Sequence, residues 1–499
     1  MGSFKKLARG SILIFFGSVL GSAFAYFFRM VLTRRISVEE YGLFAAVFAF
    51  VSLFEILRNL GIYSALTKYV SHAFALKNET GGKKIIFVSI IIEVLLAGFI
   101  ALILKSLDSF LALNYFKQPF APFVLNWMLA YFILETVSTG IQHSFLGVQK
   151  SELFALKKPL FNILSFIFVI VLPVKDARLP IMALVLGLGG TLFALSYFFS
   201  RIFRPFVKIK YKDFKIFLPK LLKFGIPTAI ASLGAIAIAQ FDTLMLTYLK
   251  TLGEVGIYNV VLPTALLLGF IGDAAGRVLF PYISELEAKK ELSKIKEKFL
   301  TAYRFTLMPA VLISLPLLLF PGYLLGLFFG SDYSIGASAL QILLVGVFFS
   351  IISGINMNII YGLGYPKIGM KITLFAAFLN IVLNLILIPQ FGIIGAAFAT
   401  FLSFFVMAVW SFFFLSQKIH LFFPQRFFFF LFSSWLIAFI SGGLIKNLFF
   451  ENFALIWQAV YSSILAGLAF LLLIWFSGIF KTEDFYKIIS IFNFNKKDE

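Results

Sequence analysis

The chain contains fourteen long apolar stretches separated by short loops, and this pattern restricts the fold more than any other feature. Each stretch is close to the roughly 20 residues that a helix needs to cross the hydrocarbon of a bilayer. Backbone groups in hydrocarbon must find hydrogen bonds within the protein, and a helix satisfies them within one segment. The sequence therefore predicts an all-α, polytopic membrane protein. The predicted spans are 10–33, 41–63, 84–105, 121–146, 152–174, 179–203, 221–249, 255–282, 300–328, 336–362, 368–389, 392–416, 427–447 and 454–480.

The basic residues alternate between loops. When each is assigned to its nearer membrane side, about four fifths of the 43 Lys and Arg fall on one side. Basic loops stay in the cytoplasm, so the bias predicts a cytoplasmic (inner) membrane protein with both termini cytoplasmic. Lys5, Lys6 and Arg9 precede the first apolar run as in a signal peptide, but no small-residue cleavage site follows. We therefore expect an uncleaved first helix.

Composition excludes several classes of protein. With 61% hydrophobic and 13% charged residues, the chain has no room for a sizeable soluble domain. The net charge of +20 lies mainly in the inner loops, where anionic lipid headgroups attract it, so no nucleic-acid partner is expected. Because the chain has no cysteine, disulfides, thiolate metal sites and a cysteine nucleophile are excluded.

The two halves of the chain resemble each other. EEYGLF, which ends at Phe44, is matched 214 positions later by GEVGIY, which ends at Tyr258, and Pro173 is echoed at nearly the same offset by Pro389. We predict an N-terminal six-helix lobe (1–205), a C-terminal six-helix lobe (206–420), and an extra helix pair with a cytoplasmic tail (421–499). Six is an even number, so both copies enter the membrane in the same direction. Parallel repeats around a central cleft are typical of transporters.

Three arginines, Arg29, Arg58 and Arg277, lie inside predicted spans. An ionisable side chain costs at least ~2.5–3.5 kcal/mol at the centre of a membrane, so each needs an explanation. A guanidinium stays charged in a dry site and its fork of donors matches phosphate oxygens, which makes all three candidate substrate-binding residues for an anionic headgroup. The alternative is a structural role in ion pairs, or at helix ends that reach the interface.

Acids in the spans are candidates for coupling or gating. Glu93 and Glu135 fall near mid-membrane without an obvious partner in sequence, so each is either a protonatable coupling site or a neutral core acid. Asp242 lies in the outer half of its span. Under the repeat offset Arg29 corresponds to the position beside Asp242, which allows the two to face each other across the cleft.

The remaining two acids each accompany an arginine. Glu55 precedes Arg58 by three residues, and Asp273 precedes Arg277 by four. Both spacings place the carboxylate and the guanidinium on one helix face, near the inner ends of equivalent predicted helices. These pairs are candidates for gating as well as for intrahelical stabilisation.

Asn380 and Asn384 add uncharged polarity to one span. They either hold helices together by hydrogen bonds or contact the hydroxyl groups of a sugar. No nucleotide-binding loop, metalloprotease motif or nucleophile elbow occurs, and no loop is large enough for a soluble active site. We therefore expect no enzyme and no cofactor, apart from a coupling ion such as H⁺ or Na⁺.

EEYGLF, GEVGIY and NIVLNLILIPQFGIIGAAFAT at 380–400 resemble the polysaccharide flippases, the O-antigen/teichoic-type exporters of the multidrug/oligosaccharidyl-lipid/polysaccharide superfamily. The resemblance covers about residues 5–480. It implies two MATE-like lobes that carry polyprenyl- or dolichyl-linked oligosaccharide across the membrane by alternating access. It also implies contacts with membrane lipids and polysaccharide-assembly proteins. Asp242 lies where similar proteins often have an acid, whereas Arg29 stands where cation-exporting relatives use an acid.

Two other functions compete with this one. An ion-coupled multidrug or cation antiporter on the same scaffold should present an acidic cleft, which three candidate arginines disfavour. A membrane-embedded glycan-processing enzyme should show a large outer loop or paired catalytic residues, and neither is visible in the sequence.

Overall fold

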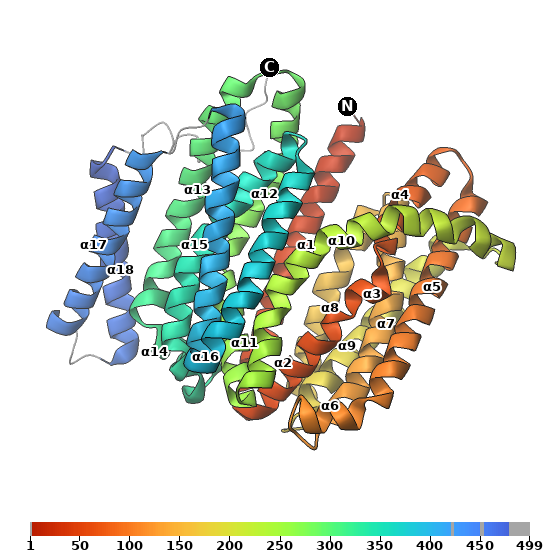
Figure 1. Cartoon of the computed structure of the whole chain (residues 1–499), viewed down its shortest axis with the longest axis horizontal. Helices are drawn as coiled ribbons and strands as arrows, with labels where there is room; N and C mark the ends of the chain where they lie inside the picture. The colour runs from red at the N-terminus through yellow and green to blue at the C-terminus, as the bar shows by residue number, and fades with distance from the viewer. Residues whose placement is uncertain (1, 421–423, 450–453, 479–499) are drawn as a thin grey trace. The chain divides into compact units, whose positions relative to one another are not determined.

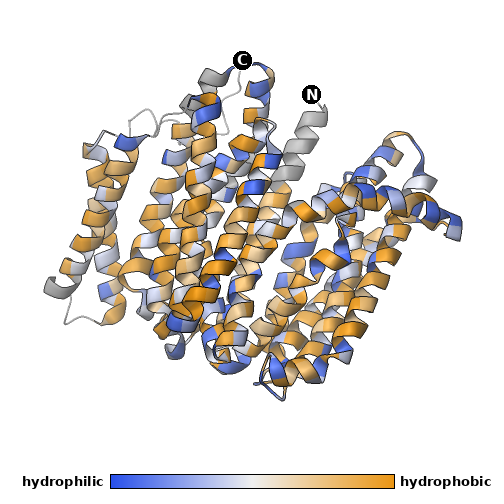
Figure 2. Cartoon of the chain, in the orientation of Figure 1, coloured by the Kyte–Doolittle hydropathy of each residue, from blue (hydrophilic) through white to orange (hydrophobic). Residues whose placement is uncertain are grey.

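The computed structural model describes residues 2–420, 424–449 and 454–478, and every regular element in these ranges is a helix (Figure 1). Twelve of the described helices are long and apolar enough to cross a membrane. Apolar residues run along the helices, and hydrophilic ones gather near their ends and in the loops (Figure 2). The predicted all-α, multi-pass membrane fold is confirmed. The predicted tail after residue 478 lies outside the described ranges.

The predicted count of fourteen spans differs from these twelve for two local reasons. α16 (Pro366–Ile419) joins the predicted spans 368–389 and 392–416 into 54 residues, with non-helical dihedral angles at Gly392. A helix of that length measures roughly 80 Å, far more than one bilayer crossing needs. The predicted span 255–282 is divided between α11 (Leu252–Leu266) and α12 (Gly269–Ala288). The count of fourteen stays a prediction.

The contacts between residues divide the chain into two compact units. Unit 1 holds the whole predicted N-terminal lobe with parts of the C-terminal lobe, and unit 2 holds the rest of the C-terminal lobe with the extra helix pair. The lobe boundaries at 205 and 420 therefore stay predictions. Unit 1 comprises residues 1–261, 326–335 and 373–400. Its helices, besides parts of α11 and α16, are α1 (Gly2–Thr33), α2 (Val38–Leu53), α3 (Glu55–Asn59), α4 (Ile62–Ala75), α5 (Glu79–Ser106), α6 (Asp108–Asn114), α7 (Ala121–Gly147), α8 (Ser151–Val171), α9 (Arg178–Phe203) and α10 (Tyr211–Leu249).

The predicted span 41–63 is wrong as one continuous helix. α2 ends at Leu53, α3 is five residues long, and the backbone turns through left-handed conformations at Leu60 (φ 45°) and Gly61 (φ 72°) before α4. A side chain on Gly61 would collide with the backbone of Gly225, since an added Cβ would lie 2.0 Å from the Gly225 carbonyl oxygen. Glycine permits both the backbone conformation and the close approach to α10. The break leaves α3 as a separate helix of five residues between α2 and α4.

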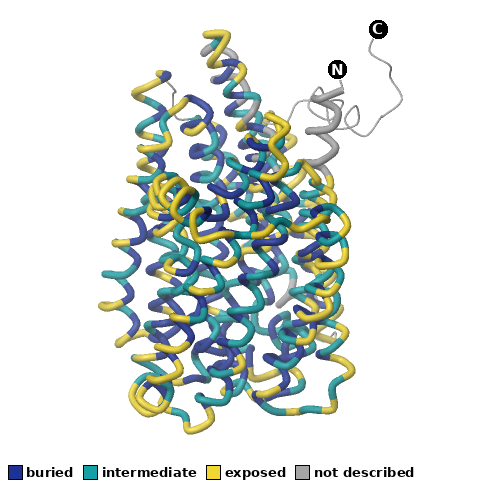
Figure 3. Tube along the Cα trace, turned by 90° about the vertical axis from the view of Figure 1, so that its right-hand side faces the viewer, coloured by how far each residue is buried: buried dark blue, intermediate teal, exposed yellow. Residues whose placement is uncertain are grey.

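Packing in unit 1 follows the apolar faces of its helices. Ile62, Phe145 and Phe203 belong to one buried cluster contributed by α4, α5, α7, α9 and α10. Buried and exposed positions alternate along the helices (Figure 3), and large apolar side chains such as Phe99 and Phe193 are exposed. Exposed apolar faces of this kind suit a lipid environment, because hydrocarbon is the solvent on the outside of a membrane bundle.

The two glycines of the repeated motif meet within unit 1. Gly42 on α2 and Gly256 on α11 allow the two backbones to touch, because an added Cβ at Gly42 would lie 1.8 Å from the Leu252 oxygen. At Gly256 an added Cβ would lie 2.3 Å from the Val38 oxygen. Each glycine also lies next to the backbone nitrogen of the other. The matched segments EEYGLF and GEVGIY therefore pack against each other through their backbones.

Unit 2 comprises residues 262–325, 336–372 and 401–499. A buried hydrogen-bond network joins three of its helices: the Tyr303 hydroxyl donates to Asn356 Oδ1 (2.8 Å), and Asn356 Nδ2 donates to Ser411 Oγ (2.9 Å). Such bonds pack membrane helices whose surfaces are otherwise apolar. The remaining elements are α12, α13 (Leu292–Leu319), α14 (Pro321–Phe329), the 3₁₀ helix η1 (Ser331–Gly336), α15 (Ala337–Gly362), α17 (Gln425–Phe449) and α18 (Leu455–Phe476), with α14 and η1 divided between the two units.

Candidate functional site

A polar cavity of about 470 Å³ lies within unit 1, where the break after α3 leaves space between α3, α4, α7, α8 and α10. Two cations and two carboxylates line it, together with amides and hydroxyl groups, in a bundle that is otherwise strongly apolar. From the sequence we expected no acidic cleft, because three candidate arginines lie in the spans. In this cavity two cations balance two carboxylates. Its polar lining residues are Glu55, Arg58, Asn59, Tyr63, Ser64, Glu135, Thr139, Gln142, Lys157, Thr228 and Ser232.

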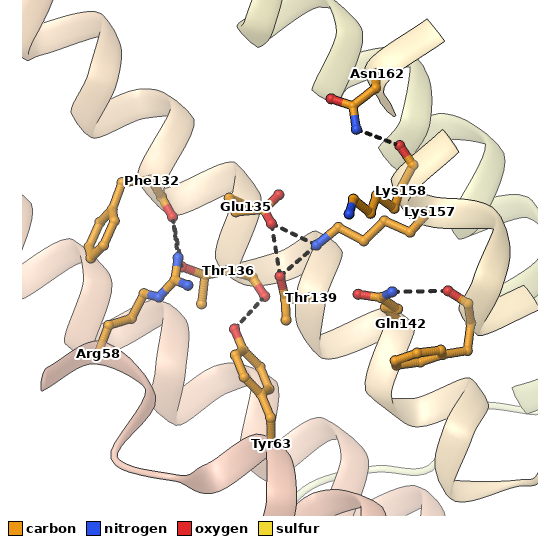
Figure 4. Close-up of polar contacts among 11 residues, drawn as sticks. Arg58, Tyr63, Phe132, Glu135, Thr136, Thr139, Gln142, Lys157, Lys158 and Asn162 are labelled. Carbon is orange, nitrogen blue, oxygen red and sulfur yellow. Dashed lines mark hydrogen bonds and ion pairs between the residues drawn. The ribbon is translucent and has the colours of Figure 1, made fainter. Parts of the chain in front are cut away.

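Arg58 is held rigidly at the cavity wall. Its Nη1 donates to the Phe132 carbonyl oxygen and to Thr136 Oγ1, each at 3.0 Å, and the guanidinium carbon lies 4.7 Å from the centre of the Phe132 ring (Figure 4). Only 4% of the residue is exposed. Its Nε has no hydrogen-bond partner among the described residues. The cation is therefore fixed by α7 and retains an unused donor.

Glu55 and Arg58 do not form the predicted intrahelical ion pair. Both line the cavity, but Arg58 bonds to α7, and no salt bridge joins it to Glu55 in the described part of the chain. The physical reason is that the Arg58 side chain turns toward α7, where the Phe132 carbonyl oxygen and Thr136 Oγ1 accept its hydrogen bonds. A three-residue spacing places two side chains on one helix face but does not exclude partners on another helix.

Glu135 has a partner that the sequence did not indicate. Lys157 Nζ donates to Glu135 Oε1 at 2.7 Å and to Thr139 Oγ1 at 2.6 Å, so α7 and α8 are joined by an ion pair at the cavity (Figure 4). Only 7% of Lys157 is exposed. In the sequence Lys157 sits near the start of a predicted span and counts as one more inner basic residue. The sequence signal that could have indicated this pair is a lysine inside the predicted span that follows the one carrying Glu135.

Glu93, on α5, is completely buried, and neither carboxylate oxygen has a hydrogen-bond partner among the described residues. It does not line the cavity. Its predicted coupling role stays a prediction.

Asp242 lies at the centre of a second polar cluster in unit 1. Its Oδ1 accepts a hydrogen bond from Asn384 Nδ2 at 2.6 Å, and its Oδ2 accepts bonds from the hydroxyl groups of Thr400 (2.5 Å) and Tyr258. Asn384 also donates to Asn380 Oδ1 at 3.1 Å. Helices α11 and α16 thus place three donors around one carboxylate of α10 that is 1% exposed.

The two asparagines predicted to contact sugar belong to this cluster. Asn380 and Asn384 are completely buried and bond to each other, and Asn384 also bonds to Asp242. In this conformation their amides hold helices together. A role in substrate binding stays a prediction that needs a different conformation of α16.

Arg29 bonds to a tyrosine and not to Asp242. Its Nε donates to the Tyr41 hydroxyl at 3.0 Å, and that hydroxyl donates to the Asn259 carbonyl oxygen at 3.3 Å. Arg29 is half-buried and does not line the polar cavity. Asn259 follows Tyr258 in the chain, and Tyr258 donates a hydrogen bond to Asp242. Arg29 and Asp242 therefore belong to adjacent hydrogen-bond networks and do not form a pair.

Asp273 and Arg277 lie on α12 in unit 2. Asp273 is exposed, and the side chain of Arg277 lies outside the described part of the structure. Their predicted roles stay predictions.

Comparisons with known proteins agree with this fold. Residues 7–287 match the family described as "Polysaccharide biosynthesis protein", and residues 227–386 match the family "MatE". An uncharacterized membrane protein, MJ1068 of Methanocaldococcus jannaschii, is 28% identical, with 87% of each chain covered. The "Probable low-salt glycan biosynthesis flippase Agl15" of Haloferax volcanii is 25% identical over 81% of this chain and 82% of the relative.

Solved structures show the same fold at low identity. The inward closed lipid II flippase MurJ has a TM-score of 0.73 at 15% identity, with 93% of this chain and 98% of that one covered. An inward-facing multidrug transporter of the MATE family, within the MOP superfamily, has a TM-score of 0.66 at 15% identity, covering 80% and 94%. The first family match spans more than half of the chain, and the chain therefore belongs to the polysaccharide biosynthesis protein family of membrane proteins.

Proposed function

We propose that this protein is a flippase, not an enzyme, and that it moves a lipid-(di)phosphate-linked oligosaccharide across the cytoplasmic membrane by alternating access. One observation carries the proposal: an apolar helix bundle encloses a polar cavity that holds Arg58, Lys157 and several amides and hydroxyl groups. The names of related proteins, among them a glycan biosynthesis flippase and a putative O-antigen transporter of Shigella flexneri, support it.

The cavity suits the physical problem of moving such a substrate. A sugar hydroxyl loses its hydrogen bonds to water in hydrocarbon, at a cost of roughly 2–7 kcal/mol for each unpaired group. Side chains such as Gln142 and Ser232 replace those bonds, and a cation replaces the water around a phosphate. In unit 2 a separate cavity of about 580 Å³ between α13, α15, α16 and α17 is lined almost entirely by apolar side chains, which suits a hydrocarbon chain.

Coupling to an ion gradient is part of the proposal. Asp242 is buried among three donors, and a bound H⁺ or Na⁺ would change how these groups bond, so the cluster is our candidate for coupling. The polyprenyl or dolichyl carrier, the cytoplasmic location of both termini and contacts with polysaccharide-assembly proteins belong to the same proposal.

A gene deletion tests the function. Loss of the protein should abolish surface glycan while lipid-linked oligosaccharide accumulates in the inner leaflet, where an impermeant glycan-modifying reagent does not reach it. Expression of the intact protein should restore both. Normal surface glycan combined with increased sensitivity to amphipathic cations would contradict the flippase and favour a drug antiporter instead.

A further inference from the structure

The strongest unassigned feature is the ion pair between Lys157 and Glu135, because it lies in the wall of the cavity. A buried lysine without a counterion is costly, and Glu135 is the anion that compensates it. Glu135 also accepts a hydrogen bond from Thr139 Oγ1 at 3.1 Å. The next residue, Lys158, is exposed and donates to Ser22 Oγ on α1 at 2.8 Å, so two adjacent lysines have entirely different surroundings.

We infer that Glu135 is a resident counterion, which the phosphate of the substrate displaces from Lys157. This inference rests on the proposed function, and it names Lys157 as the residue that selects an anionic headgroup. A phosphate group carries several acceptor oxygens, so it can accept hydrogen bonds from more donors at once than a single carboxylate oxygen does. Lys157 pairs with a carboxylate that another anion can replace, whereas two bonds to neutral groups of α7 and an aromatic ring hold Arg58.

The exchange has a consequence for protons. Once Lys157 bonds to phosphate, Glu135 is left beside an anion in a poorly hydrated site, where two negative charges repel each other. Glu135 then takes up one proton from solvent: an O–H bond forms on its carboxylate, and the phosphate keeps its charge.

Other titratable groups surround Glu135 but do not replace Lys157. Thr228 and Ser232, which α10 contributes to the cavity, are neutral. Among the described residues only Lys157 forms a salt bridge with Glu135. The titratable groups that interact electrostatically with Glu135 or Lys157 are Glu55 on α3, Tyr63 on α4, and Tyr131 and His143 on α7 itself, and Arg58 lines the same cavity.

Titration calorimetry of the full chain in detergent tests the inference, with geranylgeranyl monophosphate as the probe. Each titration is run in two buffers of different ionisation enthalpy, which reports the protons taken up on binding. The intact protein should bind with proton uptake. Glu135→Gln should bind about tenfold or more tightly without linked uptake, since the competing anion is gone. Lys157→Gln should bind at least about tenfold more weakly, as expected for loss of a charged hydrogen bond.

Three controls keep the result decisive. Lys158→Gln removes the adjacent charge and should leave affinity and proton uptake unchanged. The double variant Glu135→Gln/Lys157→Gln leaves no isolated charge, so it remains a test if one single variant misfolds; it should bind weakly and without proton uptake. Inorganic phosphate should compete only weakly, and equal affinity would assign the site to a soluble anion and overturn the inference.

The outcomes separate this inference from the proposed function. Weaker binding in Glu135→Gln, or undiminished proton uptake in that variant, would refute the resident counterion even if the deletion strain loses its surface glycan. Failure of the intact protein to bind the probe would also refute it. Normal surface glycan in the deletion strain would refute the flippase, whatever the calorimetry shows.

Discussion

The contact between Gly42 and Gly256 offers a sharp test of how the protein moves. On the predicted topology it lies at the outer ends of α2 and α11, and we predict that the two backbones separate when a substrate leaves on that side. Gly42→Ala adds one methyl group, whose carbon would lie 1.8 Å from the Leu252 oxygen. Cβ atoms in real structures essentially never lie closer than 3.0 Å to another atom. The Leu252 oxygen is a backbone atom, so it cannot move aside as the end of a flexible side chain could.

The size of the effect follows from that distance. The backbones of α2 and α11 must move apart by roughly 1 Å, and overpacking of this kind typically costs about 1–3 kcal/mol. This cost applies to the conformation in which the helices touch and disappears when they separate. A bias of that size changes the ratio of two conformations by roughly 5–150-fold. Gly42→Ala should therefore shift the protein towards separated helices.

Cysteine labelling measures this shift, because the chain has no cysteine of its own. Val38→Cys places a single thiol against Gly256, since Val38 Cγ1 lies 3.1 Å from the Cβ that an alanine would have there. A water-soluble maleimide should label Val38→Cys at least about fivefold faster when Gly42→Ala is also present. Gly256→Ala should have the same effect.

Gly253 supplies the matched control in the same segment. An added Cβ there would meet nothing closer than 3.7 Å, so Gly253→Ala should change neither the labelling rate nor the unfolding temperature. Unchanged labelling in Gly42→Ala would refute the reasoning. It would mean that the backbones yield locally, and that this contact does not hold one conformation in place.

Two further predictions concern stability. Asp242→Ala leaves three buried donors without their acceptor and should destabilise the protein by about 2–4 kcal/mol; an unchanged thermal unfolding midpoint in detergent would count against the network. The backbone N–H of Lys210 and the ammonium group of Lys84 lower the pKa of Asp213 at the start of α10, so its stabilising effect is present above its unfolded pKa and is lost as pH falls through the folded pKa. The difference in unfolding midpoint between the native chain and Asp213→Asn should therefore shrink on acidification, and a pH-independent difference would contradict this linkage.

Sequence alone determined the class of the protein, because a bilayer imposes one-dimensional rules. Span length and loop charge are local quantities that a chain reveals without knowledge of its packing. The motif glycines were visible too, but their contact was not, since it joins segments 214 positions apart. The fold class and the family followed from such patterns.

Only the tertiary structure decided which charges belong together. The partner of Glu135 lies on the next helix, and Asp242 collects donors from two other helices, so neither set could be found from spacing within one segment. Arg58 likewise bonds to α7 and not to Glu55, which shares its helix. Local sequence specifies where a helix enters the membrane, whereas the pairing of buried charges depends on how separate helices pack against one another.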